Sequence, residues 1–284
     1  MKNRGLILFF ILIFVFVGVT FSLSKPQKFS FSFHRENLQS VVKKELEGVD
    51  GRYGIYIKNL KTGETFEQNG KQSFAPGSLY KLWVMGVVFQ QIKDGKLKED
   101  DPLSANVAQL NRDFGIPAEE AELKSGVLNF SVKSATEQMI TISHNYAAMA
   151  LTQKVGQTAL ADFLKQYGFS NSAVGDDLKT TPEDIAKFFE KLYKGEIIDA
   201  EYSQRMVEIL ARQTINDRIP KYLPSGTKIA HKTGDLGYFE NDGGIVYSLG
   251  GDFIIVALTE TNHPDIADEK IARISEVAYK YFNK

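Results

Sequence analysis

The chain has 284 residues, of which 43% are hydrophobic and 24% are charged, so it is long enough to bury a large core. Its 34 Lys and Arg residues nearly cancel 35 Asp and Glu residues, and this balance argues against nucleic-acid binding and against an acidic disordered chain. The sequence has no cysteine, which excludes disulfides, thiol nucleophiles and thiolate metal sites.

The N-terminus carries an export sequence. Lys2 and Arg4 precede an uncharged apolar stretch at residues 5–23, which is the arrangement of a signal segment. The stretch is nearly long enough to span a membrane as a helix, and the small residues near its end would also suit cleavage. We therefore expect residues 1–24 to be either a signal peptide or a membrane anchor. Residues 25–33 form a linker, and everything after residue 24 is expected outside the cytoplasmic membrane.

The folded domain is expected at residues 34–284 and begins with a helix and a hairpin. Apolar residues between positions 34 and 48 recur at helical spacing, and Gly48 closes the pattern. Residues 52–70 hold two short runs rich in Tyr, Ile and Phe around a turn, which predicts a β-hairpin.

A helical middle follows. Thr181 and Pro182 mark one helix start, as the cap and the first helical residue. The segment 106–129 is rich in Glu and Asn and is interpreted as a surface insertion that borders a cleft. Apolar periodicity predicts helices at residues 78–95, 131–155, 158–167, 182–193 and 201–212.

The last part of the chain returns to strands. Three apolar runs with short connections predict an antiparallel meander, and an amphipathic pattern predicts a closing helix. The predicted fold class is α/β, of the α+β type, with two lobes. One lobe is an antiparallel sheet flanked by the first and last helices, and the other is all-helical, at about residues 78–215. The strands are expected at residues 228–233, 243–249 and 252–260, and the helix at 268–282.

Ser78 and Lys81 stand at the start of an apolar helix. Residues three apart share a helix face, so the amine can accept the hydroxyl proton if burial and neighbouring charge lower its pKa. A helix start also offers backbone N–H groups and a positive field to an oxyanion. A capping serine followed by an exposed lysine would have the same spacing, so this pair alone does not decide the matter.

Two further motifs favour the chemical interpretation. Ser143 and Asn145 stand at the head of an Ala-rich run, and Lys232, Thr233 and Gly234 lie on a predicted strand. With the order SxxK, SxN and KTG, the sequence resembles the serine β-lactamase and penicillin-binding protein superfamily over essentially all of residues 34–284. It looks most similar to class A β-lactamases and the serine hydrolases related to them.

The resemblance implies an acyl-transfer reaction without a cofactor. Ser78 would attack the carbonyl carbon of a β-lactam or a peptidoglycan peptide, and Lys81 would accept or relay its proton. Ser143 would pass a proton to the departing nitrogen. Lys232 would set the electrostatics around Ser143.

The remaining motif residues would hold the substrate. The resemblance implies that Asn145 positions Lys81 and the substrate's side-chain amide, and that Thr233 and Gly234, with the neighbouring lysine, belong to a carboxylate site. The backbone N–H groups of Ser78 and Asp235 would form the oxyanion hole. Partners are thus a small-molecule β-lactam or a peptidoglycan peptide, with no nucleic acid, and we expect a monomer.

One motif of class A enzymes is missing. Their ExxLN glutamate activates the water that releases the acyl group, and the segment before Thr181 contains no such motif. Glu183 is interpreted as helix-dipole stabilisation. Asp176 and Asp177 are interpreted as loop acids, with a role as the missing base left open. We therefore expect slow deacylation.

Two histidines lie beside the motifs. His144 is interpreted as a structural residue pointing into the helical lobe, although its charge could tune the nearby lysines. Strand alternation places the side chain of His231 on the face opposite Lys232. The last strands contain no Arg or Lys, so a substrate carboxylate would rely on Lys232 or on a residue from elsewhere.

Three functions follow as hypotheses. The first is a β-lactamase-like serine hydrolase working through acyl-Ser78 with slow release. The second is a D-alanyl-D-alanine carboxypeptidase or peptidoglycan amidase of the penicillin-binding type. The third is a non-catalytic cell-wall sensor, which the intact set of proton-relay residues argues against. No HExxH, GxxxxGKS/T or GxGxxG run points to a metal or nucleotide enzyme.

Overall fold

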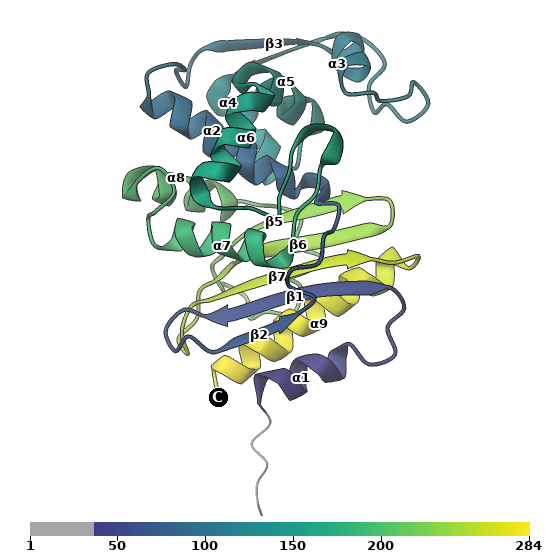
Figure 1. The fold of residues 1–284 in the computed structure, drawn as a ribbon, viewed down its shortest axis with the longest axis vertical. Coiled ribbons are helices and arrows are strands. Elements are labelled where there is room, and N and C mark those ends of the chain that lie inside the picture. The colour runs from purple at the N-terminus through teal and green to yellow at the C-terminus, as the bar shows by residue number, and fades with distance from the viewer. Residues whose placement is uncertain (1–36) are drawn as a thin grey trace, which may run out of the picture. The chain divides into compact units, whose positions relative to one another are not determined.

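A five-stranded antiparallel sheet forms the centre of the fold in the computed structural model, which describes residues 37–284 (Figure 1). The strand order is β2-β1-β7-β6-β5, so the first hairpin joins the sheet beside the last strand of the chain. The strands span Arg52–Asn59 (β1), Thr65–Gln68 (β2), Ile229–Leu236 (β5), Phe239–Val246 (β6) and Phe253–Glu260 (β7).

The central strand β7 is buried on both faces because helices cover each side of the sheet. Phe253, Ile255 and Ala257 pack with the first and last helices, while Ile254 and Val256 belong to the core of the helical lobe. Successive side chains of a strand point to opposite faces, so a continuous apolar run serves two cores at once. The helices on the first face are α1 (Leu38–Glu45) and α9 (Pro264–Phe282).

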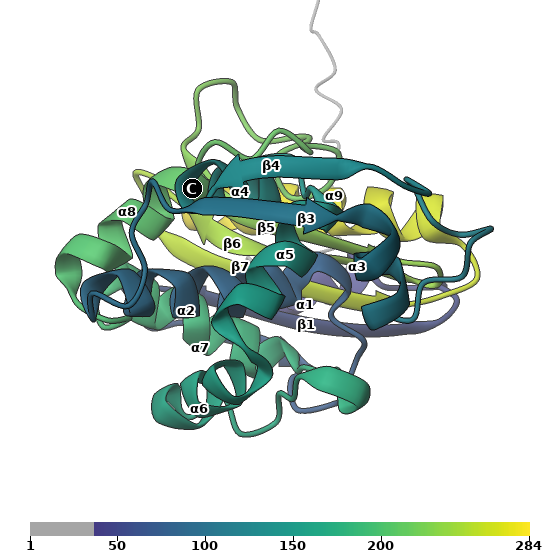
Figure 2. The same ribbon diagram turned by 90° about the horizontal axis from the view of Figure 1, so that it is seen from above.

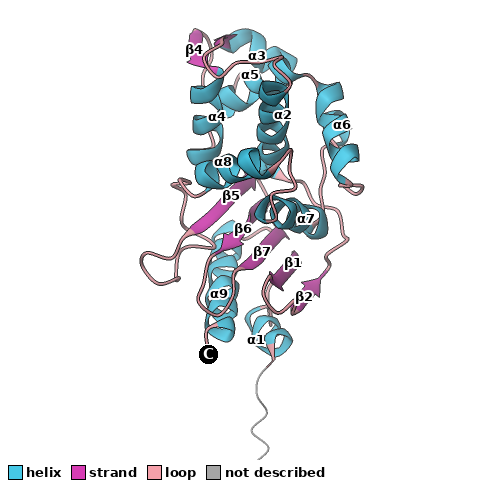
Figure 3. Ribbon diagram, turned by 90° about the vertical axis from the view of Figure 1, so that its left-hand side faces the viewer, coloured by secondary structure: helices cyan, strands magenta, loops and turns pink. Residues whose placement is uncertain are grey.

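The helical lobe lies on the other face of the sheet (Figure 3). Trp83 in α2 is 1% exposed and belongs to the core of this lobe. The lobe comprises a 3₁₀ turn η1 (Gly77–Tyr80), α2 (Lys81–Lys93), α3 (Val107–Asp113), α4 (Val132–Thr141), α5 (Asn145–Val155), α6 (Gln157–Tyr167), a 3₁₀ turn η2 (Gly175–Asp177), α7 (Pro182–Tyr193) and α8 (Ala200–Leu210).

The lobe is not purely helical. A two-stranded ribbon, β3 (Pro102–Asn106) with β4 (Val127–Ser131), lies over the helices α4 and α5 (Figure 2). Together with α3 it takes up both ends of the segment 106–129 that we expected to be a surface insertion, and residues 114–126 form the loop between them. Val107 and Leu110 of α3 are buried, because they supply an apolar face to the lobe, and only the loop after α3 is largely exposed.

Several element boundaries differ from the sequence-based predictions. The helix expected at residues 131–155 is broken between α4 and α5, where Ser143 takes a left-handed backbone conformation with φ +56°. Strand β6 begins at Phe239 instead of residue 243, and α9 begins at Pro264 instead of residue 268. A proline at the first helical position fits α9, because its missing N–H has no partner there in any helix.

The predicted signal or anchor and most of the linker fall outside the described residues. Within residues 37–284, no helix combines the length and apolarity needed to cross a membrane.

Candidate active site

Ser78 and Lys81 lie on one edge of a tight turn. Ser78 belongs to the 3₁₀ turn η1, and Lys81 is the first residue of α2. A 3₁₀ helix has about three residues per turn, so side chains three apart eclipse one another. Lys81 is fully buried and Ser78 is half-buried. Lys81 is therefore not the exposed lysine of the alternative interpretation, and it follows Ser78 by three residues at the start of α2.

The 3₁₀ turn η1 packs directly against strand β5. Gly77 has φ +49°, and a Cβ added there would lie 2.9 Å from the backbone nitrogen of Asp235. A Cβ on Gly234 would lie 2.4 Å from the carbonyl oxygen of Pro76 and 3.1 Å from the nitrogen of Ser78. Two glycines are needed because each faces backbone across the contact. The backbone nitrogens of Ser78 and Asp235 thereby face each other across this close contact between η1 and β5.

Ser143 occupies the break between α4 and α5. A left-handed conformation is uncommon for a residue other than glycine and costs about 1 kcal/mol. It turns both the carbonyl and the hydroxyl of Ser143 toward Lys81, whose Nζ donates to them at 2.7 and 3.1 Å.

The amine of Lys81 also reaches the first residue of α5. Its Nζ donates to Asn145 Oδ1 at 2.7 Å, and Asn145 Nδ2 in turn donates to Glu122 Oε1 at 2.5 Å. Among the described residues, the hydrogen bonds of Lys81 go to Ser143 and Asn145, and none goes to Ser78.

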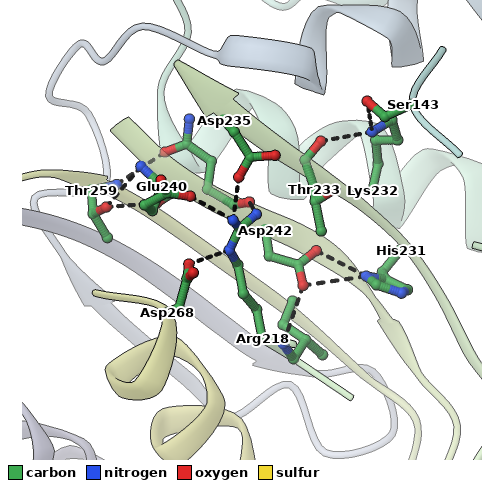
Figure 4. A network of polar contacts seen from close by, with 12 residues as sticks. Ser143, Arg218, His231, Lys232, Thr233, Asp235, Glu240, Asp242, Thr259 and Asp268 are labelled. Atoms are coloured by element: carbon green, nitrogen blue, oxygen red, sulfur yellow. Dashed lines mark hydrogen bonds and ion pairs between the residues drawn. The ribbon is translucent and has the colours of Figure 1, made fainter. Parts of the chain in front are cut away.

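Lys232 approaches Ser143 from the sheet. Its Nζ donates to Ser143 Oγ at 3.0 Å and to its neighbour's carbonyl, Thr233 O, at 2.8 Å (Figure 4). Lys232 and Thr233 are both fully buried. Thr233 Oγ1 is buried and has no hydrogen-bond partner among the described residues.

Both amines are held in conditions that disfavour their charge. Burial, followed by the nearby charge of Lys232, lowers the pKa of Lys81 to about 6. Burial lowers the pKa of Lys232 to about 7, although the charges of Asp242 and Asp235 oppose this shift. Burial and the neighbouring charge therefore favour the unprotonated amine of Lys81, the form that can accept a proton.

A guanidinium lies behind β5, and sequence reasoning missed it. Arg218 contacts Asp235, Glu240 and Asp268 and donates from Nη1 to the carbonyl of Asn241 at 3.2 Å (Figure 4). Its side chain is 4% exposed. No sequence motif predicts a role for Arg218, because this residue lies in the irregular segment 211–228 before β5.

The pKa values of two carboxyl groups around Arg218 are shifted in opposite directions. Burial, followed by a hydrogen bond with Asp235, raises the pKa of Glu240 to about 8. Burial opposes ionisation of Asp235 too, but that hydrogen bond and Arg218 hold its pKa below the ordinary value. Asp235, whose backbone N–H is expected in the oxyanion hole, is thus held through its side chain by Arg218 and Glu240.

His144 and His231 make the structural contacts that we predicted. His144 caps α5 by accepting from the backbone N–H of Ala147 at 3.2 Å, and its ring packs edge-on against Phe130. His231 is buried, with Nδ1 3.0 Å from Asp242 Oδ1. It lies next to Lys232 in sequence and contacts a different set of residues.

The segment between α6 and α7 holds no glutamate near the site. Glu183 lies in the first turn of α7, where its N–H donates to the carbonyl of Gly70 at 2.9 Å. Asp177 pairs with Lys179, and Asp176 lines a cavity of about 760 Å³. Within residues 37–284, neither aspartate forms a hydrogen bond or an ion pair with Ser78, Lys81 or Ser143.

The assembled groups can carry out acyl transfer. A hydroxyl stands one turn from a buried amine, two backbone nitrogens face each other beside it, and a second hydroxyl lies between two amines. The predicted residues Ser78, Lys81, Ser143, Asn145, Lys232, Thr233, Gly234 and Asp235 come together here, whereas Asp176 and Asp177 do not join them.

Comparison with known proteins agrees with this arrangement. The family model described as "Beta-lactamase enzyme family" matches residues 35–282. The extended-spectrum beta-lactamase PER-1 of Pseudomonas aeruginosa is 25% identical, over 89% of this chain and 91% of that protein.

Solved structures share the fold. The structure of PBP-A has a TM-score of 0.76 and 24% identity, and covers 87% of this chain and 96% of its own. A beta-lactamase from Sphaerobacter thermophilus has a TM-score of 0.77 and 24% identity, and covers 86% of this chain and 97% of its own. Because the family model covers nearly the whole described region, the chain belongs to the beta-lactamase enzyme family.

Proposed function

We propose that the protein opens β-lactam amides through an ester on Ser78 and releases the acyl group slowly. The observation that carries the proposal is the position of Ser143 Oγ, which lies 3.1 Å from Lys81 Nζ and 3.0 Å from Lys232 Nζ. A hydroxyl between two amines can move a proton from the nucleophile side to the leaving-group side.

During acylation, Lys81 and Ser143 carry a proton from Ser78 to the leaving nitrogen, and both residues end in their starting forms. Unprotonated Lys81 takes the proton of Ser78 as Oγ attacks the carbonyl carbon, and the C–O bond forms. The N–H groups of Ser78 and Asp235 stabilise the negative oxygen. As the C–N bond breaks, Ser143 gives its proton to the nitrogen and is reprotonated by Lys81, which restores the neutral amine.

The substrate carboxylate is assigned to the other side of Ser143. Lys232 keeps part of its charge near neutral pH because its pKa is about 7. The unpartnered Thr233 Oγ1 can donate to the same anion. Arg218 is already committed to three carboxyl groups, so no direct contact with the substrate carboxylate is assigned to it.

The proposal of slow release is supported by the segment between α6 and α7. Hydrolysis of the ester needs a base that orients water. The segment offers only Asp176 and Asp177, which have other surroundings. Without an oriented water, the acyl-enzyme persists.

The relatives support the substrate class. Several are named beta-lactamases, and one solved structure is a mutant of PBP-A in an acyl-enzyme complex with penicillin G, with a TM-score of 0.75 to this chain. Those statements concern those proteins, and for this chain they make a penicillin the sensible first probe.

The experiment is covalent labelling with a fluorescent penicillin, using Ser78→Ala as the variant and Ser172→Ala as the matched control. Ser172 lies in the loop before α7 and hydrogen-bonds Thr180 and Asp184. We expect label on the parent and the Ser172 variant and none on Ser78→Ala. Label that survives Ser78→Ala would contradict the proposal.

A second candidate is a D-alanyl-D-alanine peptidase of the penicillin-binding type. The absence of a nearby base in the α6–α7 segment favours it, because such an enzyme would be inhibited by the same long-lived ester. Release of D-alanine from a peptidoglycan pentapeptide, lost in Ser78→Ala, would establish this activity. Lack of turnover on every substrate would leave the sensor hypothesis.

We further propose that the protein acts as a monomer outside the cytoplasmic membrane. The location outside the membrane is supported by Lys2 and Arg4, which precede the apolar stretch 5–23. Fractionation of cells, followed by the mass of the mature N-terminus, distinguishes a cleaved signal from an anchor.

A further inference from the structure

A carboxylate that no motif predicts lies within the group of catalytic side chains. Glu122 belongs to the exposed loop between α3 and β4, yet its Oε1 accepts from Asn145 Nδ2 at 2.5 Å. Its charge also acts on Lys81 and on His144, raising the pKa of each against the effect of burial. Glu122 is therefore electrostatically part of the site.

The placement of Glu122 is built by buried side chains. Its neighbour Leu123 is held through both backbone groups: its N–H donates to Tyr146 Oη at 2.9 Å, and its carbonyl accepts from Tyr146 Oη at 2.8 Å and from Asn111 Nδ2 at 2.8 Å. Tyr146 is 2% exposed and Asn111 is 8% exposed. Because Tyr146 follows Asn145 on α5, one helix start both faces the site and anchors the loop that carries Glu122.

The hydrogen bonds connect the site residues in one continuous chain. Lys232 and Thr233 lie at one end, Ser143 and Lys81 follow, and Asn145 with Glu122 forms the other end. The leaving nitrogen and its carboxylate belong at the Lys232 end, because Ser143 supplies the proton there. The acyl part of the donor must then extend toward Asn145 and Glu122.

We propose that Glu122 is a specificity residue that selects acyl donors carrying an ammonium group on the carbon beside the carbonyl of their acylamino side chain and rejects donors carrying a carboxylate there. This inference rests on the proposed function and names the substrate class of the same site. A carboxylate at the acyl end attracts a cation and repels an anion.

Three penicillins that differ in the charge of one side-chain substituent test this selection. Ampicillin, benzylpenicillin and carbenicillin carry an ammonium, a hydrogen and a carboxylate, respectively, on the same side-chain carbon. The second-order rate constant for acylation of Ser78 in the full-length protein is measured for each at pH 6.5, by competition with a fluorescent penicillin. The parent should rank them in that order, with a step of about fivefold between neighbours.

The matched variants are Glu122→Gln and Glu119→Gln. The glutamine keeps an oxygen acceptor for Asn145 and removes the charge, so the ampicillin-to-carbenicillin ratio should fall to within about twofold of unity. Glu119 lies in the same loop and is exposed, and its variant should keep the parental ratio. Glu122→Lys should reverse the order.

The outcomes separate the two levels of the argument. Equal rates for the three penicillins in the parent, or an unchanged ratio in Glu122→Gln, would overturn the specificity role while leaving acyl transfer intact. Absence of an adduct with all three would overturn the proposed function together with this inference.

Discussion

Lys81 and Lys232 approach the same atom, Ser143 Oγ, with their amine nitrogens at 3.1 and 3.0 Å. They reach it from different lobes, since Lys81 begins α2 and Lys232 lies in β5. Two buried amines this close disfavour each other's charge. The arrangement therefore provides one amine that accepts protons and one that keeps part of its charge.

The rate of acylation should follow a narrow bell-shaped pH profile. Lys81, with a pKa of about 6, must lose its proton before it can act as a base, so the rate rises as pH increases through about 6. Lys232 loses its charge as pH rises through about 7, which weakens carboxylate binding. Stopped-flow measurement between pH 5 and 9 should place the maximum between these values. A rate that climbs steadily to pH 9 would contradict this assignment.

Replacing Lys81 by Met should abolish acylation and stabilise the fold at pH 7. The folded-state pKa of about 6 lies below the ordinary 10.5, so the unfolded chain binds more protons between these values and stability increases with pH across that window. Methionine removes this penalty and loses some hydrogen bonds, for a net gain of about 2 kcal/mol. Urea denaturation of the parent and the variant measures this change in the free energy of unfolding.

Two controls test the origin of that gain. The exposed Lys154, changed to Met, should leave stability within about 0.5 kcal/mol of the parent. The gain of the Lys81 variant should shrink as the pH is raised toward 10. A gain that does not depend on pH would point to packing instead of charge.

Two substitutions of Ser143 distinguish the effect of backbone strain on stability from the effect of the hydroxyl on the acylation rate. Ser143→Gly and Ser143→Ala both remove the shared hydroxyl, so both should lower the acylation rate by about 100-fold. Only glycine relieves the φ of +56°, so Ser143→Gly should be about 1 kcal/mol more stable than Ser143→Ala. Thermal unfolding of the pair measures this difference, and equal stabilities would argue against strain.

Gly234→Ala should damage the oxyanion hole more than the fold. Its Cβ would lie 2.4 Å from the carbonyl oxygen of Pro76 and would push β5 away from Ser78. Removing one oxyanion donor costs about 100-fold or more in rate. Gly243→Ala on the next strand meets only side-chain atoms, from 3.1 Å, and should acylate at nearly the parental rate. Similar losses in both variants would implicate general destabilisation.

The sequence predicted the parts of the molecule that have local signals. Helical spacing placed Ser78 beside Lys81, strand alternation separated His231 from Lys232, and the cap at Thr181 begins α7 as expected. Each of these depends on geometry within a few residues.

The rest depends on contacts between distant segments. The start of β6 is polar, and Glu240, Asn241 and Asp242 look unlike a strand until Arg218, Thr259 and His231 provide their partners. The break at Ser143 is stabilised by Lys81, far away in sequence. Glu122 joins the site because Tyr146 anchors its loop. No local pattern encodes such pairs.

Time-resolved intact mass spectrometry of the protein mixed with a slight excess of benzylpenicillin tests the central claim most directly. Acylation and release are then followed in one experiment. The account predicts one adduct with the mass of the intact drug, absent in Ser78→Ala, that forms quickly and persists long after the free drug would have been consumed by a fast hydrolase. An adduct that disappears as fast as the drug is hydrolysed would contradict slow release and would require a water-activating base.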